Sequence, residues 1–146
     1  MTNKESEIRI HRMTPDDIDA VRSIDRKISG LDRSLTYDIK DVIRGKIELS
    51  FIAEVNDKAV GFVLSSLAYV PDEIFEACVI QIMGVEPNYW RRGIASKLVQ
   101  TLLDAARSKR IRMIKIMIDK EDRELTGLFE HFSFKQGRFI DYSRIL

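Results

Sequence analysis

The sequence predicts a mixed α/β or α+β fold in a single domain that spans residues 1–146. Apolar residues recur with periods of about 2 and about 3.6 residues in different stretches, which indicates both strands and helices. The chain has 146 residues and a hydrophobic content of 45%, which suits one domain with its own core. No internal repeat, low-complexity tract or Gly/Ser/Pro-rich linker divides the sequence.

The first elements are a strand and two helices. Residues 8–13 alternate apolar and polar side chains and predict a strand. Thr14 followed by Pro15 is typical of a helix start, and the helix is expected to stop at Gly30. A second, shorter helix is predicted over residues 36–46.

A hairpin follows these helices. Residues 49–56 and 58–70 are both strand-like, and Asn56-Asp57 between them is typical of a tight turn.

The second half of the sequence alternates strands and helices. In order, it predicts strand 76–87, helix 92–108, strand 113–119, helix 123–133, and one strand or a bent pair over 134–146. Two β-α-β units favour parallel pairing late in the chain. Mixed order of this kind predicts a sheet with helices covering its faces.

Composition excludes several classes of function. The net charge is +1, without the basic excess of most nucleic-acid binders. No apolar run approaches the roughly 18–20 residues that span a bilayer, and the N-terminus lacks the apolar region of a secretory signal. Cys78 is the only cysteine, and His11 and His131 are the only histidines, too few for most metal sites. We therefore expect a cytoplasmic protein without a metal, membrane or nucleic-acid partner.

The start of helix 92–108 has the composition of an anion site. The first N–H groups of a helix lack intrahelical partners and carry the positive end of its dipole. Gly93 lets a ligand approach the backbone closely. Small or basic residues lie around it: Arg91, Arg92, Ala95, Ser96 and Lys97. These features suit a pyrophosphate, although a strand-to-helix turn of this composition can also be no more than a turn.

Two segments resemble motifs of the GNAT superfamily of acyl-CoA-dependent N-acyltransferases. Residues 83–95, MGVEPNYWRRGIA, are similar to a Val-x-Pro-like turn followed by Gln or Arg, two residues, Gly, one residue, and Gly or Ala. Residues 128–134, LFEHFSF, resemble the family's Leu-Tyr-x-x-x-Gly-Phe segment. The order of elements over residues 8–146 is similar as well.

The resemblance implies a fold and a reaction. The expected fold is a GNAT-like, mostly antiparallel central sheet of six or seven strands with four helices on both faces. The expected reaction moves an acetyl group from acetyl-CoA to a primary amine, which attacks directly. The amine could belong to a protein N-terminus, a lysine or a small molecule. The neighbourhood of the motif looks a little like the ribosomal-protein N-terminal acetyltransferases, and a homodimer is also expected.

The resemblance also implies a cosubstrate site. The CoA pyrophosphate would lie on the backbone N–H groups of residues 91–96, and the pantetheine arm in a V-shaped gap between strands 76–87 and 113–119. A bulge at Met83-Gly84 would open the gap and direct an N–H at the thioester carbonyl. The cosubstrate-binding residues implied are Met83, Gly84, Val85, Arg91, Arg92, Gly93, Ile94, Ala95, Ser96, Asp122 and Phe129.

The sequence departs from the family pattern at several positions. Trp90 replaces the motif's Gln or Arg, and an indole has one donor and no charge. Phe129 stands where a tyrosine that protonates the leaving thiolate is common. Ser133 replaces a glycine, and Asp122 replaces a common asparagine. These departures keep open an alternative function, a CoA-binding or regulatory module with impaired catalysis.

Three residues are candidates for catalysis, each with an ordinary structural alternative. Glu76 could act as general base or be a solvated charge at a strand end. Gln81 could orient a water or the amine, or be a satisfied polar residue on a sheet face. Tyr142 could replace the missing proton donor or be an edge-strand tyrosine.

Overall fold

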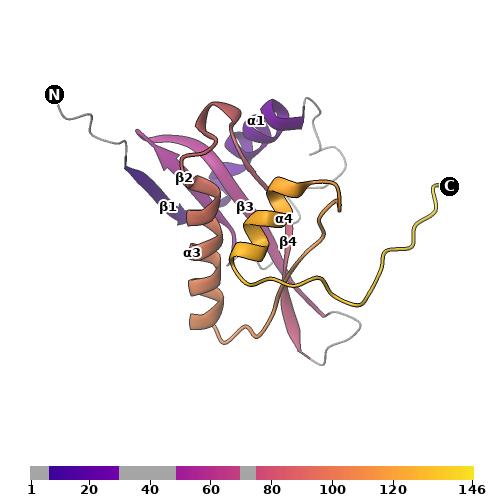
Figure 1. Ribbon diagram of the computed structural model, residues 1–146. Helices are drawn as coiled ribbons and strands as arrows, with labels where there is room; N and C mark the ends of the chain where they lie inside the picture. The colour runs from indigo at the N-terminus through magenta and orange to yellow at the C-terminus, as the bar shows by residue number, and fades with distance from the viewer. Residues whose placement is uncertain (1–6, 30–48, 70–74) are drawn as a thin grey trace.

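The computed structural model describes residues 7–29, 49–69 and 75–146, and this part of the chain forms a five-stranded sheet (Figure 1). The strands follow one another in sequence order: β1 (Ile8–Arg12), β2 (Phe51–Val55), β3 (Lys58–Tyr69), β4 (Glu76–Val85) and β5 (Ile114–Ile116). Neighbouring strands are antiparallel except β4 and β5, which are parallel. The predicted mixed, mostly antiparallel sheet is confirmed, with fewer strands in this part than the six or seven expected.

Helices cover both faces of the sheet, as predicted. The described residues form three α-helices, α1 (Ile18–Ser29), α3 (Ile94–Ser108) and α4 (Arg123–His131), with short 3₁₀ turns η1 (Pro15–Asp17) and η3 (Pro87–Tyr89). In Figure 1, α3 and α4 lie in front of the sheet and α1 lies behind it. The helix predicted over residues 36–46 lies outside the described residues. The other three of the four expected helices can be compared with the structure.

Two apolar clusters hold these layers together. On one face, α1 packs on the sheet through a cluster that contains Val21, Ile24, Ile52, Phe62, Leu64 and Ile82. On the other face, α3 and α4 contribute Leu98, Val99, Leu102 and Phe129 to a larger cluster. The apolar stripe read from helix 92–108 is therefore the face that docks α3 on the sheet.

Local turn chemistry explains how the first elements begin. The Thr14 backbone N–H donates to the Asp17 carboxylate at 2.8 Å, which caps the turn that leads into α1. Asn56 and Asp57 both have positive φ, 51° and 60°, as a two-residue turn between twisted strands requires. The predicted hairpin of β2 and β3 is confirmed.

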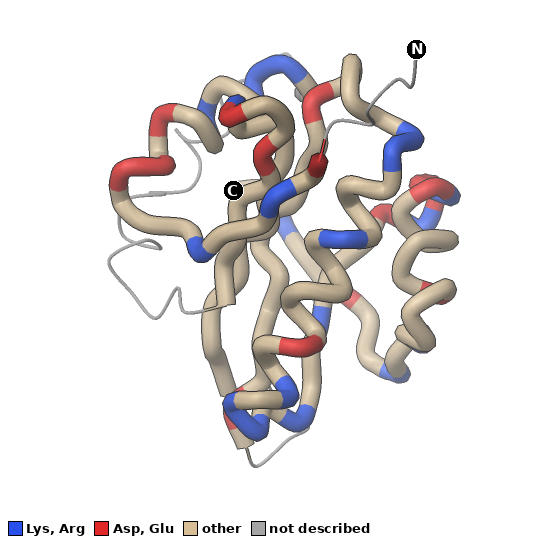
Figure 2. The backbone as a smooth tube through the Cα atoms, turned by 90° about the vertical axis from the view of Figure 1, so that its left-hand side faces the viewer, with Lys and Arg blue, Asp and Glu red and all other residues tan. Residues whose placement is uncertain are grey.

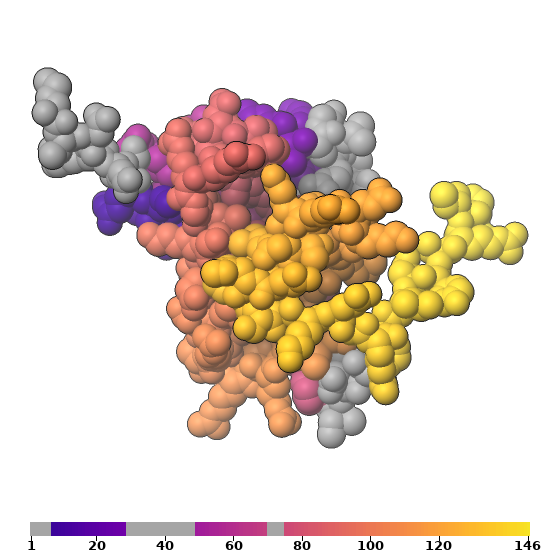
Figure 3. Space-filling view, viewed as in Figure 1, coloured from indigo at the N-terminus to yellow at the C-terminus, as the bar shows by residue number. Residues whose placement is uncertain are grey.

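Residues 134–146 form neither a strand nor a pair of strands, which contradicts the prediction. The ring of Phe134 packs edge-to-face on Phe129 with 4.9 Å between centroids. After α4 the chain crosses the front of the molecule, and its C-terminal part then extends away from the body (Figure 3). A strand requires a neighbour for its backbone groups, and no strand of the described sheet pairs with this segment. Only one of the two expected parallel pairings, between β4 and β5, is therefore present among the described strands.

A buried carboxylate connects α1, β3 and the end of β4. Glu86 follows β4 directly, and its side chain is only 6% exposed. Its Oε1 lies 3.2 Å from Lys27 Nζ on α1, and its Oε2 lies 3.6 Å from Lys58 Nζ at the start of β3. A buried carboxylate requires such partners. Glu86 thereby fixes the end of β4 relative to the elements on either side of it.

His11 of β1 introduces a pH-dependent contact. Its Nδ1 lies 2.9 Å from the Arg12 carbonyl oxygen, and its Nε2 lies 2.8 Å from Glu54 Oε1 on β2. A neutral imidazole can donate from only one nitrogen, whereas the protonated ring donates from both. Burial lowers the pKa of His11, but these hydrogen bonds and the charges of Asp17 and Glu54 outweigh burial and raise that pKa above its ordinary value.

We expect His11→Gln to destabilise the protein at acidic pH and to have a smaller effect at alkaline pH. The pKa of His11 is raised in the folded state. The contribution of His11 to the free energy of unfolding is therefore complete below the unfolded pKa, about 6.5, and is lost as pH rises through the folded pKa. Urea unfolding of both proteins at about pH 5.5 and about pH 8.5 measures the difference. An equal difference at both pH values would contradict the contact.

Candidate active site

The end of β4, strand β5 and the start of α3 enclose the candidate site. β5 pairs with β4 only from Cys78↔Ile114 to Ile80↔Ile116, whereas β4 continues to Val85. Residues 81–85 therefore extend beyond the part of β4 that β5 pairs with. The pairing between β4 and β5 thus ends where the resemblance implies a V-shaped gap between the two strands.

The bulge that accompanies the gap is at Gln81, and the predicted position at Met83-Gly84 is wrong. Leu64 of β3 pairs with Ile82, and the next residue, Ser65, pairs with Ile80, so Gln81 is the additional residue in β4. From Met83 to Val85 the register with β3 is regular. Buried hydroxyls on the β3 side accompany the shift: the Ser65 N–H donates to Ser50 Oγ at 2.9 Å, and Ser65 Oγ donates to the Leu49 carbonyl.

The bulge reverses the direction of the backbone groups of β4. Before it, the Cys78 N–H donates to the Met113 carbonyl at 2.9 Å, on the β5 side. After it, the Glu86 N–H donates to the Val60 carbonyl at 2.7 Å, on the β3 side. In a regular strand the backbone N–H groups of successive residues alternate between the two sides, so those of residues 78 and 86 would face the same side. The extra residue explains why they face opposite sides. It follows that the N–H and C=O groups of Met83 and Val85 face away from β3, into the gap.

The side chains show the same reversal. Cys78 and Ile80 before the bulge, and Met83 and Val85 after it, all pack in the cluster beneath α3. Gly84 faces the opposite side, where an added Cβ would collide with the Cδ1 atom of Ile28 on α1. The small size of Gly84 thus allows α1 to pack against β4, a role that the sequence did not indicate.

Trp90 closes the turn between β4 and α3. Its indole Nε1–H donates to the Val85 carbonyl oxygen at 2.6 Å, although the side chain is half exposed. That carbonyl is one of the groups that face the gap. The residue in the Gln/Arg position of the motif therefore binds its own chain instead of being directed at a phosphate.

The start of α3 has the backbone geometry expected of an anion site. Gly93 is the N-cap, with φ 78° and ψ 12°, and no atom lies within 4 Å of a Cβ added there. Arg91 also has a positive φ, 62°. The first intrahelical hydrogen bond runs from the Lys97 N–H to the Gly93 carbonyl at 3.0 Å. The N–H groups of residues 94–96 therefore have no partner within the helix. A phosphate oxygen can approach this turn as closely as the prediction requires.

The side chains around the helix start divide into anchors and exposed cations. Ile94 is buried and holds the first turn of α3 on the sheet, while Ala95 and Ser96 are partly exposed. Arg91 and Arg92 are exposed, and the Arg92 guanidinium lies 5.0 Å from the centre of the Tyr89 ring. Lys97 is not directed at the helix start, because its Nζ donates to the Ile8 carbonyl at 2.8 Å.

The other predicted site residues lie in different places. Gln81 is at the mouth of the gap, and its Nε2 donates to Ser66 Oγ at 3.0 Å. Glu76 is at the opposite end of β4, about 17 Å from Gln81 at roughly 3.3 Å per strand residue. Asp122 caps α4 by accepting the Leu125 N–H at 3.0 Å, and Phe129 is buried in the core. Tyr142 is 87% exposed in the segment that leaves the body.

Glu86, which connects the elements around the gap, was not among the predicted residues. Its partners Lys27 and Lys58 are far away in sequence. Glu86 stands next to Pro87 at the end of an apolar strand, and nothing in this local pattern marks it as buried.

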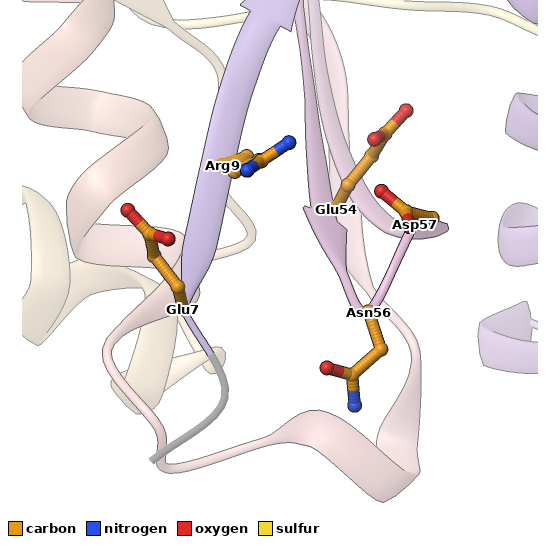
Figure 4. Close-up of a pocket in the computed structure, with 5 residues that line it drawn as sticks. All are labelled: Glu7, Arg9, Glu54, Asn56 and Asp57. Atoms are coloured by element: carbon orange, nitrogen blue, oxygen red, sulfur yellow. The ribbon is translucent and has the colours of Figure 1, made fainter. Parts of the chain in front are cut away.

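Two surface depressions lie at the β1 edge of the sheet, and the larger one extends along β1 to Lys97 and Thr101 of α3. A shallow depression at the β1–β2 edge is lined by Glu7, Arg9, Glu54, Asn56 and Asp57, from two strands and the hairpin turn (Figure 4). It lies at the opposite edge of the sheet from the gap. Figure 2 shows acidic and basic residues interspersed along the backbone, with several basic residues gathered at its lower end. Within residues 7–29, 49–69 and 75–146, no group of His, Cys, Asp and Glu could hold a metal, and no helix could cross a membrane.

Known proteins resemble this chain in sequence. The model of the acetyltransferase (GNAT) family matches residues 18–134. An uncharacterized N-acetyltransferase of Methanocaldococcus jannaschii is 23% identical over 140 residues. The match covers 90% of this chain but only 62% of that relative, so the chain spans less than two thirds of its length.

Solved structures share the fold. Aminoglycoside N-acetyltransferase AAC(6′)-Iy in complex with CoA gives a TM-score of 0.81 at 18% identity, and the match covers 99% of each chain. The ribosomal-protein-S18-alanine N-acetyltransferase from Escherichia coli gives a TM-score of 0.76 at 18% identity, covering 90% of this chain and 79% of that one. The strand divergence, the helix start and the family match over residues 18–134 lead to one conclusion: the chain belongs to the GNAT family of acetyltransferases.

Proposed function

We propose that the protein is an acetyl-CoA-dependent N-acetyltransferase whose acceptor is a primary amine. The observation that carries the proposal is the combination at the end of β4. Backbone groups of Met83 and Val85 face a gap between β4 and β5. One turn later, Gly93 has a left-handed conformation, and the backbone amides that follow it lack intrahelical partners. Family membership and the solved relative in complex with CoA support this assignment.

Each part of acetyl-CoA has a complementary part of the chain. The pyrophosphate is bound by the backbone amides of residues 91–96, with Arg91 and Arg92 adding positive charge. The pantetheine amides pair with β4 at Met83 and Val85, in the manner of a short additional strand. Because Trp90 already donates to the Val85 carbonyl, the Val85 N–H and both backbone groups of Met83 remain for the pantetheine.

The chain contributes chiefly position and a hydrogen-bond donor to the reaction. The amine nitrogen forms a bond to the thioester carbon, and a backbone N–H in the gap stabilises the negative charge that develops on the carbonyl oxygen. The C–S bond then breaks, and CoA leaves as the thiolate. A thiol pKa of about 8.5 makes that thiolate a stable leaving group near neutral pH, so Phe129 in place of a tyrosine does not prevent the reaction.

The amine must also lose a proton during the reaction. Gln81 lies at the mouth of the gap, where its amide can orient the amine or a water. Glu76 is too far along β4 for direct contact with an amine at that position. An α-amino group has a pKa of about 7.7–8.0 and therefore needs little assistance to lose its proton. This favours an acceptor with a weakly basic amine, such as a peptide N-terminus.

A screen for cosubstrate binding and turnover tests the proposal. Thermal shift with acetyl-CoA measures binding, and thiol release measures turnover with a panel of peptides, lysine, polyamines and an aminoglycoside. We expect a thermal shift together with thiol release for at least one amine. No thermal shift would overturn the proposed function, and a shift without release for any amine would indicate a CoA-binding module instead.

We expect Gly93→Val and Arg92→Glu each to weaken acetyl-CoA binding by about tenfold or more, which corresponds to about 1.4 kcal/mol. Valine at φ 78° strains the turn and places a side chain where the phosphate binds, and Arg92→Glu reverses a charge beside it. Isothermal titration measures both affinities. Arg107→Glu is the matched control, because it makes the same charge change about 21 Å along α3. Affinity retained in both test variants would contradict the anion site.

We expect Trp90→Phe to raise the KM for acetyl-CoA about 2- to 12-fold with little change in kcat. The substitution removes a hydrogen bond of about 0.5–1.5 kcal/mol that orders the turn before the cosubstrate binds. Trp90 is the only tryptophan in the chain, so its fluorescence in the wild type should change on titration with CoA. Unchanged fluorescence and an unchanged KM would show that the contact has no role in binding.

A further inference from the structure

We propose that Tyr89 is a positioning residue for Arg92: its ring holds the Arg92 guanidinium beside the start of α3 before acetyl-CoA arrives, ready to bind a phosphate. This inference rests on the proposed function and deepens it. It assigns Tyr89 a role that acts through Arg92 and not through its own contact with the cosubstrate.

Two cations from different parts of the chain approach the ring of Tyr89. The guanidinium carbon of Arg92 lies 5.0 Å from the ring centre, and Lys58 Nζ lies 5.8 Å from it. Both distances are within the roughly 6 Å over which the face of an aromatic ring attracts a cation. Arg92 belongs to the turn before α3, whereas Lys58 begins β3, so the ring connects this turn to the sheet.

The ring of Tyr89 is itself held in place. Tyr89 ends the short turn η3, and its backbone N–H donates to the Glu86 carbonyl at 2.8 Å. Its side chain is partly buried and packs against the apolar cluster beneath α3. Lys58, which approaches the ring, lies 3.6 Å from the buried Oε2 of Glu86. Backbone, packing and charge thus anchor the ring on which Arg92 lies.

Arg92 keeps its charge available for a ligand. Among the described residues, no carboxylate lies within ion-pair distance of Arg92. A ring orients a guanidinium without neutralising it, whereas a carboxylate would do both. A guanidinium over a ring also keeps its N–H donors free for a phosphate. Lys58 differs in this respect, because the Glu86 carboxylate already balances its charge.

The position of Arg92 makes this orientation useful to the site. Arg92 directly precedes Gly93, the left-handed N-cap of α3, after which the N–H groups lack intrahelical partners. A mobile arginine side chain loses rotamer freedom when it binds a phosphate, which opposes binding. A side chain that is already held loses less, so affinity rises. An exposed cation–π contact changes an equilibrium constant about two- to fivefold, which is the expected size of the effect.

Nuclear magnetic resonance of the free protein tests the contact without any ligand. Protons over an aromatic ring are shifted upfield, so the side-chain signals of Arg92 should be shifted in the wild type and in Tyr89→Phe. In Tyr89→Leu they should return to ordinary arginine values. Arg92→Lys identifies these signals, because they disappear in that variant. Ordinary values in the wild type would overturn the proposal.

A double-mutant cycle then tests whether Tyr89 acts through Arg92. Alone, Tyr89→Leu should weaken CoA binding about two- to fivefold, and it should have no further effect when Arg92→Gln is present. Leucine keeps an apolar side chain where Tyr89 packs, and Tyr89→Phe should bind CoA like the wild type. Tyr69→Leu is the matched control at the other end of β3, where the side chain is 72% exposed, and should leave the affinity unchanged. Isothermal titration measures all of these affinities.

The outcomes of the cycle separate this inference from the proposed function. A wild type that does not bind CoA would overturn the proposed function, and this inference with it. A wild type that binds CoA while Tyr89→Leu binds it equally well would overturn this inference alone. The same holds if Tyr89→Leu weakens binding as much in the Arg92→Gln background as without it, since the effect would then not pass through Arg92.

Discussion

One extra residue in β4, Gln81, is the constraint on which the candidate site depends. Without it, the backbone groups of β4 would keep one alternation from Cys78 to Glu86, and Met83 and Val85 would be directed at β3. With it, those two residues face the gap where β4 and β5 diverge. The bulge is held from the β3 side, because Gln81 donates to Ser66 and the buried Ser50 and Ser65 satisfy the neighbouring backbone.

The turn after β4 links the bulged strand to the start of α3. Glu86 is fixed by lysines from α1 and β3, and Trp90 donates to the Val85 carbonyl, so both ends of the turn are anchored. The buried Ile94 then holds the first turn of α3 on the sheet, with the left-handed Gly93 directly before it. The gap and the helix start are thus parts of one rigid arrangement, which is what binding a long, two-part cosubstrate requires. Trp90 departs from the family motif, and its hydrogen bond within the turn suggests that it acts by ordering the turn.

Features that depend on local chemistry were predictable from the sequence. The Asn56-Asp57 hairpin and the apolar stripe of α3 agree with the structure, because turn and helix patterns are local. The bulge was expected two residues too late, since its position depends on how β3 pairs with β4 and on the buried serines. The ion pairs of Glu86 join residues far apart in sequence and have no local signal. The segment from Phe134 onward has the composition of a strand, but a strand also requires a neighbour to pair with, which composition does not reveal.

Amide hydrogen exchange at single-residue resolution is the most direct measurement of the β4 geometry. The amides of Met83 and Val85 should exchange rapidly in the free protein and become protected when CoA is added, while the Gly84 amide, which faces β3, should be protected in both states. Protection of Met83 and Val85 without CoA, or no change when CoA is added, would contradict the account that the bulge at Gln81 directs these groups into the binding gap.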